Sequence, residues 1–171
     1  KSATYLTRPE REVVLALNKA RRDPPRFAEQ YLRAKKDSGS FAAECYREML
    51  ALKPMGALAP SKALSLSAQA HAADMGRSGR TGHDGTDGSS MSDRIERFGA
   101  WTGTISENCS YGPSDPLEIV LQLLIDEGVA SRGHRRNILN PESSFVGVGI
   151  RPHSGYRWNC VQDFAGGITD R

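Results

Sequence analysis

The stretch that decides the fold is FVGVGIRPHSGYRWNCVQDF, residues 145–164. It contains two strand-like runs, 145–150 and 157–164, in which valine, isoleucine and aromatic residues are frequent. Between these runs, the sequence PHSG at 152–155 supplies the proline and glycine that tight turns favour. The stretch therefore predicts a β-hairpin near the end of the chain.

Helical patterns dominate the sequence that precedes this hairpin. Apolar residues recur at three- and four-residue spacing after Pro9, and further helices are expected over 26–33, 41–52 and 61–76. Ser61 is the expected N-cap of the last of these helices. Four helices are thus expected before any strand begins.

The pattern changes in the middle of the chain. Residues 76–90 contain five glycines, which is typical of a loop. A short helical segment is expected over 92–98, a weak strand over 105–109, and a helix that begins near Pro116 with Ser114 as its cap. Helices followed by a small, mostly antiparallel sheet predict an α+β fold.

Length, composition and charge exclude several classes of protein. A chain of 171 residues, 38% hydrophobic and 25% charged, fits one globular domain. Its apolar runs are too short to cross a membrane. The net charge of +3 and the short basic clusters, each close to acidic residues, argue against a nucleic-acid partner. No signal peptide is visible at the start, which fits a mature secreted protein as well as a cytosolic one.

Three polar residues stand out as candidates for a functional site. His83 lies in the glycine-rich loop, where functional residues are common. His134 lies between arginines, which favour the neutral imidazole that binds metal ions. Glu107 lies on the weak strand and is by itself only a polar strand residue. His71 is expected to pack on its helix and His153 to be exposed in the hairpin turn, so neither is assigned a role.

Glu127 has two interpretations. The apolar stripe of the helix that begins near Pro116 passes through Leu117, Leu121 and Leu124, and position 127 is next on that face. If the helix continues, Glu127 points toward the core and needs a polar partner. If the helix ends earlier, Glu127 reaches solvent and needs none.

Together these segments resemble the CAP superfamily, which includes cysteine-rich secretory, antigen-five and plant pathogenesis-related proteins, and they are most similar to its bacterial-type SCP branch. The resemblance extends from about residue 11 to residue 164. The motifs that carry it are EVVLALNKAR (12–21), QAHAADM (69–75), GHDG (82–85), SEN (106–108), RGHRRNIL (132–139), VGVG (146–149) and CVQDF (160–164).

This resemblance implies a three-layer α-β-α sandwich with a central, mostly antiparallel sheet. It implies a single CAP/SCP domain over residues 1–171, with its core at about 9–166. It also implies a cleft lined by His83, Glu107, Glu127 and His134. Two neutral imidazoles and one or two carboxylates suit zinc or another divalent metal, whereas without a metal the same residues form a hydrogen-bonded acid–base cluster that holds the cleft together. Extra residues before His134 depart from the family pattern and leave Asp126 as a rival to Glu127.

The resemblance implies a secreted or extracytoplasmic monomer that binds a protein, glycan or lipid ligand without turnover. A metal-dependent hydrolase using Glu107 or Glu127 as general base is the alternative, although no nucleophile motif such as GxSxG is present. A lipid or sterol carrier is the second alternative, without support from an apolar surplus in the sequence. Cys109 and Cys160 either form a disulfide or, with Cys45, remain buried thiols.

Overall fold

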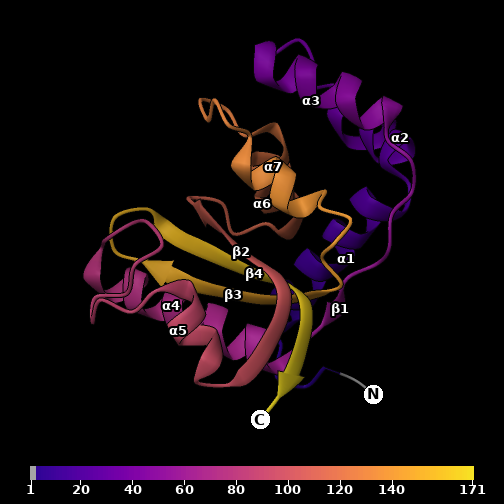
Figure 1. Cartoon of the computed structure of the whole chain (residues 1–171). Coiled ribbons are helices and arrows are strands. Elements are labelled where there is room, and N and C mark those ends of the chain that lie inside the picture. The colour runs from indigo at the N-terminus through magenta and orange to yellow at the C-terminus, as the bar shows by residue number, and fades with distance from the viewer. Residues whose placement is uncertain (1–2) are drawn as a thin grey trace.

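A four-stranded sheet forms the middle layer of the computed structural model, which describes residues 3–171 (Figure 1). Its spatial order is β1-β3-β4-β2. The strands are β1 (Ala59–Pro60), β2 (Gly99–Tyr111), β3 (Phe145–His153) and β4 (Arg157–Asp170). β3 and β4 form the expected antiparallel hairpin, β2 pairs antiparallel with β4, and only the short β1 runs parallel to β3. The prediction of a mostly antiparallel sheet is confirmed.

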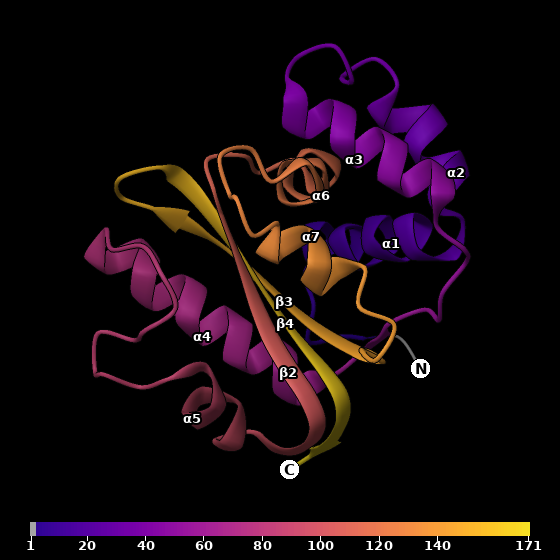
Figure 2. The ribbon, with the colours of Figure 1, turned by 45° about the horizontal axis from the view of Figure 1, so that its top comes forward.

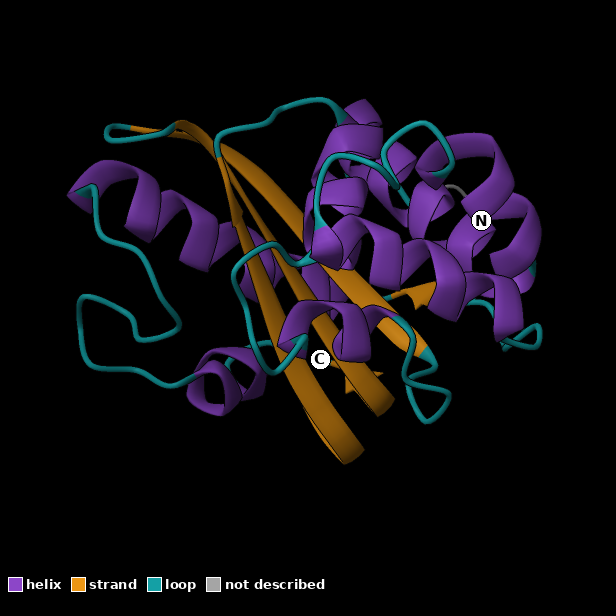
Figure 3. Cartoon of the chain, turned by 90° about the horizontal axis from the view of Figure 1, so that it is seen from above, coloured by secondary structure: helices purple, strands orange, loops and turns teal. Residues whose placement is uncertain are grey.

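Helices cover both faces of this sheet (Figures 1 and 2). They are α1 (Arg8–Arg22), α2 (Pro24–Phe27), the π-helical turn η1 (Ala28–Leu32), α3 (Ser40–Ala51), α4 (Lys62–Ser78), α5 (Met91–Glu96), α6 (Pro116–Ile125) and α7 (Gly133–Ile138). α4 and α5 lie on one face, whereas α1, α6 and α7 lie on the other, and Figure 3 shows the strands passing between the two groups. The α+β, three-layer α-β-α architecture is confirmed.

The alternation of side chains along the strands rules out a disulfide between Cys109 and Cys160. Cys109 pairs with Val161, and Cys160 pairs with Ser110, so the two sulfur atoms belong to opposite faces of the sheet. Cys109 packs on the α4 side, and Cys160 belongs to the core on the α1 side. All three cysteines, including Cys45, are free and buried, and the disulfide alternative is therefore wrong.

Two glycines of β3 let the backbone of α4 lie directly on the sheet. A Cβ added at Gly147 would overlap the backbone of Leu64 and Ser65. A Cβ at Gly149 would come within 2.5 Å of the backbone nitrogen of Gln69. The VGVG sequence thus alternates valines, which face the α1 core, with glycines, which accept α4.

Two fully buried arginines fasten the helical layer that contains α1. Arg135 of α7 pairs with Glu44 (2.7 Å) and Glu48 (2.8 Å) of α3. Arg21 of α1 donates to main-chain carbonyls at 2.8–3.0 Å, those of Gly56, Ile138, Asn140 and Ser143. These bonds satisfy the guanidinium in the interior and connect α1 to the segment between α7 and β3.

Three local expectations are corrected. The cap of α6 is Asp115, not Ser114, because the Asp115 carboxylate accepts from the first-turn amides. β2 is 13 residues long rather than five, because it pairs with β4 along nearly its whole length. His153 is buried rather than exposed, since its ring bonds to the Arg80 carbonyl and accepts amides of the turn.

Within residues 3–171, the helices are all too short or too polar to span a bilayer. α4, the longest of them, has 17 residues and packs along the sheet.

We expect Gly147→Ala to destabilise the fold by about 2–3 kcal/mol or more, because its methyl group would force α4 away from β3. Gly56→Ala is the matched control, since nothing lies within 4 Å of a Cβ at that position. Urea unfolding, monitored by circular dichroism, measures the free energy of unfolding of both variants. Equal stability of the two variants would contradict the role given to this contact.

Candidate functional site

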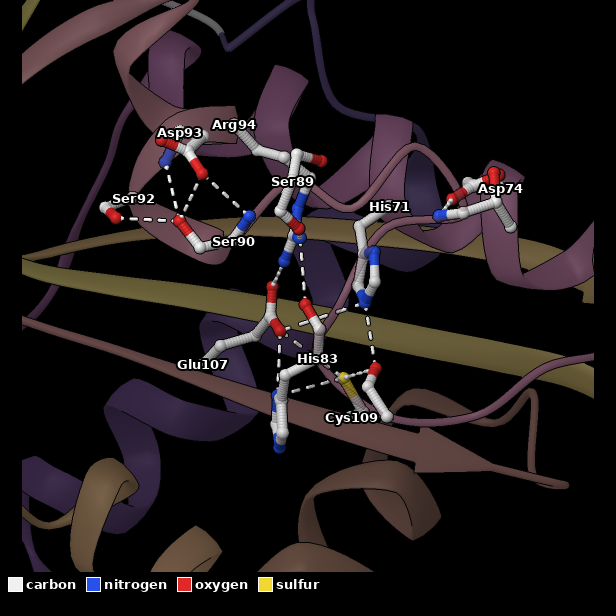
Figure 4. A network of polar contacts seen from close by, with 12 residues as sticks. His71, Asp74, His83, Ser89, Ser90, Ser92, Asp93, Arg94, Glu107 and Cys109 are labelled. Carbon is white, nitrogen blue, oxygen red and sulfur yellow. Dashed lines mark hydrogen bonds and ion pairs between the residues drawn. The ribbon is translucent and has the colours of Figure 1, made fainter.

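A buried carboxylate on the edge strand organises the first half of the site. Glu107 of β2 accepts a hydrogen bond from Nδ1 of His83 at 2.8 Å and one from the Arg94 guanidinium at 2.6 Å (Figure 4). Arg94 also donates to the main-chain carbonyls of His83 (2.8 Å) and Ser89 (3.0 Å). The glycine-rich loop is thereby held against β2, with the His83 side chain still 55% exposed.

Behind Glu107 lies His71 of α4, which is fully buried. Its Nε2 atom is 2.9 Å from the carbonyl of Gly82 and 3.8 Å from the Glu107 carboxylate. Burial lowers the pKa of His71, and the ring is therefore neutral at pH 7. The Cys109 sulfur lies 3.8 Å from both Glu107 and Nδ1 of His83. His71, Glu107 and Cys109 thus form a possible metal site, with ligand atoms within 4.8 Å of one another.

The second half of the site comes from the end of α6 and the start of α7. His134 donates from Nδ1 to Asp126 at 2.7 Å, and its main-chain N–H donates to the same carboxylate at 3.0 Å. Asp126 ends α6 in the left-handed conformation (φ 58°), which turns its buried side chain back toward α7. Glu127 follows outside the helix and is exposed. Of these two acidic residues, Asp126 is the one bonded to His134.

Two asparagines join the halves. Asn108 of β2 donates to the main-chain carbonyl of His134 at 3.2 Å. Asn137 of α7 donates to the main-chain carbonyl of Glu107 at 3.3 Å and to the Asn108 side chain at 2.8 Å. The elements that carry the two histidines are therefore tied to neighbouring positions of the same edge strand.

A cavity of about 590 Å³ opens beside His134. Its lining combines apolar side chains with a few polar ones, and comprises Ser38, Cys109, Tyr111, Gln122, Leu123, Ile125, Asp126, Glu127, Val129 and His134. The same cavity thus includes His134, both acidic candidates and the thiol that adjoins His83. Concave sites of this size and mixed lining suit a small ligand or a side chain of a partner.

The ionisable groups in the first half of the site shift one another's pKa values. The hydrogen bond to Glu107 raises the pKa of His83, against the opposing effect of partial burial. Burial by itself would raise the pKa of Glu107, but the hydrogen bond from His83 and the charge of Arg94 outweigh burial and lower it. Asp163, opposite Glu107 on β4, is fully buried; burial and the nearby Glu107 raise its pKa well above the usual range. Asp163 therefore keeps its proton while Glu107 is ionised.

The structure thus brings His83 and Glu107 into direct contact and bonds His134 to Asp126, while Glu127 stays at the cavity wall without a hydrogen bond to either histidine among the described residues. Sequence reasoning missed Arg94 and gave His71 only a packing role. His71 is indeed packed on its helix, but its ring also reaches the site. No local pattern marks Arg94, because its partner lies on a different element.

Comparison with known proteins gives a consistent picture. The family model described as the cysteine-rich secretory protein family, CAP, matches residues 14–164. An uncharacterised protein of Bacillus subtilis, YkwD, is 35% identical over 120 residues, which are 70% of this chain and 42% of that protein. The chain thus spans less than half the length of this curated relative.

Two solved structures share the fold. One is an extracellular protein of Bacillus anthracis that contains an SCP domain, with a TM-score of 0.50 and 24% identity over 73% of this chain and 38% of that chain. The other is an outer surface protein of Borrelia burgdorferi, with a TM-score of 0.51 and 18% identity over 72% of this chain and 86% of that chain. At these identities the likeness concerns the fold alone.

We expect the pKa of His83, followed by NMR, to lie above the ordinary value and to fall in Glu107→Gln, because a neutral amide stabilises the imidazolium less than a carboxylate. The stability that this proton contributes is present below about pH 6.5 and is lost as the pH rises through the raised pKa of His83. Asp84→Asn, which removes a weaker neighbouring charge, should shift the pKa much less. Equal shifts in both variants would contradict the assignment.

Proposed function

The chain belongs to the cysteine-rich secretory protein (CAP) family, and we propose on this premise that it is a single extracytoplasmic recognition domain whose cleft binds a divalent metal, with zinc as the expected ion. One observation carries the proposal. Both cleft histidines use Nδ1 to bond a buried carboxylate, His83 to Glu107 and His134 to Asp126.

An ionised carboxylate only accepts hydrogen bonds, so each Nδ1 atom carries the hydrogen. In the neutral ring the Nε2 atom then keeps its lone pair, and Figure 4 shows this atom of His83 turned away from Glu107. Histidines that bind metal ions commonly have this arrangement, in which a carboxylate fixes the tautomer and the orientation of the ring. His83 and His134 are therefore the proposed ligands, whereas Glu107 and Asp126 orient them.

A metal bound by the two histidines needs further ligands. Glu127 is exposed in the wall of the same cavity and can supply an oxygen, and water suits the remaining positions. A bound divalent ion would supply a Lewis acid to a ligand in the cavity. Two imidazole ligands fit zinc better than calcium or magnesium, which prefer sites composed of oxygen atoms.

The buried group of His71, Glu107 and Cys109 fits a hydrogen-bond network better than a metal. The Gly82 carbonyl can only accept, so Nε2 of His71 carries a hydrogen and lacks a lone pair for coordination. Burial raises the pKa of the Cys109 thiol well above its usual range. Glu107, the third member, already neutralises the Arg94 guanidinium. The metal is therefore proposed at the outward imidazoles rather than here.

Recognition is proposed over turnover because Glu107, a general base that a hydrolase would use here, is ion-paired with Arg94 and its pKa is lowered, which makes it a weak base. The Cys109 thiol next to the cleft is also a poor nucleophile. A thiol must ionise to attack, and burial opposes this in Cys109. The extracytoplasmic assignment is supported by two proteins with the same fold, one described as extracellular and one as an outer surface protein. A monomer that binds a protein, glycan or lipid ligand remains the proposed form.

We expect isothermal titration calorimetry at neutral pH to detect one zinc ion per wild-type chain and none in His83→Ala/His134→Ala. Glu107→Gln should keep the site but weaken it by about 10- to 100-fold, because the carboxylate acts through the imidazole. Affinity should also fall as the pH drops through the raised pKa of His83, since a protonated ring cannot bind the metal.

Asp84→Asn and Cys109→Ser are the controls, and both should bind zinc as the wild type does. Circular dichroism confirms that every variant is folded. Absence of binding to the wild type would overturn the metal assignment. Binding that survives the double histidine substitution but disappears in Cys109→Ser would move the site to the buried group and overturn it equally.

A further inference from the structure

A second cavity, of about 720 Å³, lies between α1 and the α2–η1 segment and shares no lining residue with the cleft cavity. We name it the α1–α2 groove. Its lining consists of Leu15, Asn18, Lys19, Arg22, Asp23, Arg26, Phe27, Gln30 and Tyr31. A smaller cavity of about 220 Å³ continues from it toward the start of α6 and shares Leu15, Lys19 and Tyr31.

One wall of the α1–α2 groove is built from a π-helical turn. In η1 the amide of Arg33 bonds to the carbonyl of Ala28 at 2.9 Å, five residues earlier. This wider turn carries Gln30 and Tyr31, both of which line the groove. Turns of this kind are rare and occur frequently at functional sites.

Three cations line the groove without an acidic partner. Lys19, Arg22 and Arg26 are exposed and form no ion pair within residues 3–171. Nearby pairs such as Arg33–Glu29 show that arginines on this side do find partners where a carboxylate is in reach. Asp23, the acidic residue of the lining, is used as the cap of α2 and accepts the amide of Arg26 at 3.1 Å.

The part of the chain that contains α1 to α3 has a positive net charge, as the groove does. Residues 1–55 contain twelve lysines and arginines and seven acidic residues, a net charge of +5, whereas the rest of the chain has a net charge of −2. Lys19 and Arg22 lie in the last turn of α1, where they also interact favourably with the helix dipole. The interaction with the helix dipole leaves the charged ends of both side chains free to bind a ligand.

The lining of the groove also contains apolar and aromatic side chains, those of Leu15, Phe27 and Tyr31. Leu15 of α1 is 60% exposed. Tyr31 is half-buried, and its ring lies 4.8 Å from that of the buried Phe27, measured between centroids. An exposed leucine next to an aromatic ring suits an apolar side chain of a ligand.

We propose that the α1–α2 groove binds an acidic peptide segment of a partner protein. Carboxylates of the segment pair with Lys19, Arg22 and Arg26, and an apolar side chain of the segment packs on Leu15 and Tyr31. A peptide is favoured over a polyanion such as polyphosphate because a polyanion would use the cations and leave the apolar residues uncovered. This site is independent of the metal cleft.

The test uses a fluorescein-labelled six-residue peptide that alternates glutamate with leucine or phenylalanine, followed by fluorescence anisotropy with the full chain. We expect saturable binding that weakens with added salt. Arg22→Glu/Arg26→Glu should reduce affinity at least about tenfold by turning attraction into repulsion. Leu15→Ser should reduce it about fivefold or more through the lost apolar contact.

Each variant has a matched control. Arg77→Glu/Arg136→Glu alters the net charge equally at two exposed arginines outside the groove, and Leu50→Ser alters an exposed leucine of α3. Both controls should bind the peptide as the wild type does. Equal losses in the two charge-reversal variants, or no binding to the wild type, would overturn the proposal. So would displacement by polyphosphate together with unchanged binding in Leu15→Ser, which would indicate a site for polyanions.

Discussion

The close approach of α4 to β3 is the constraint on which the rest of the structure depends. Gly147 and Gly149 leave no side chains between this helix and its strand, so the helix backbone rests on the sheet. Residues of β2 and β4 that face α4 are then enclosed beneath it. Glu107 and Asp163, a directly opposed pair on these strands, are both buried for this reason.

Enclosure makes the charge of Glu107 costly unless it is paired. Arg94 and His83 supply the partners, and the neutral His71 closes the interior side. Because Asp163 keeps its proton, the pair of carboxyl groups carries a single negative charge. The Glu107 carboxylate, whose buried charge these partners offset, also fixes the ring of the exposed His83. Stability and the geometry of the cleft therefore depend on one residue.

The two cavities lie in different parts of the fold, one at the edge of the sheet and one between helices. The cleft forms at the outer edge of β2, which has no neighbouring strand beyond it, and loops from both helical layers converge there. The α1–α2 groove forms where the chain turns sharply between two helices at Asp23 and Pro24. The cleft cavity combines apolar side chains with the carboxylates of Asp126 and Glu127, whereas the α1–α2 groove combines three cations with apolar side chains. The two cavities therefore favour ligands of different charge.

Local pattern alone determined the hairpin, the helical segments and the mostly antiparallel sheet, because periodicity and turn residues act over a few positions. Motifs also identified His83, Glu107 and His134 as candidates, without showing what each contacts. Only the tertiary structure decided that Asp126 rather than Glu127 bonds to His134, since a left-handed residue ends α6 there. Likewise it brought Arg94 to Glu107 and separated Cys109 from Cys160. Such contacts depend on how distant elements pack and on which face of the sheet each side chain lies. The spacing of residues along the chain specifies neither.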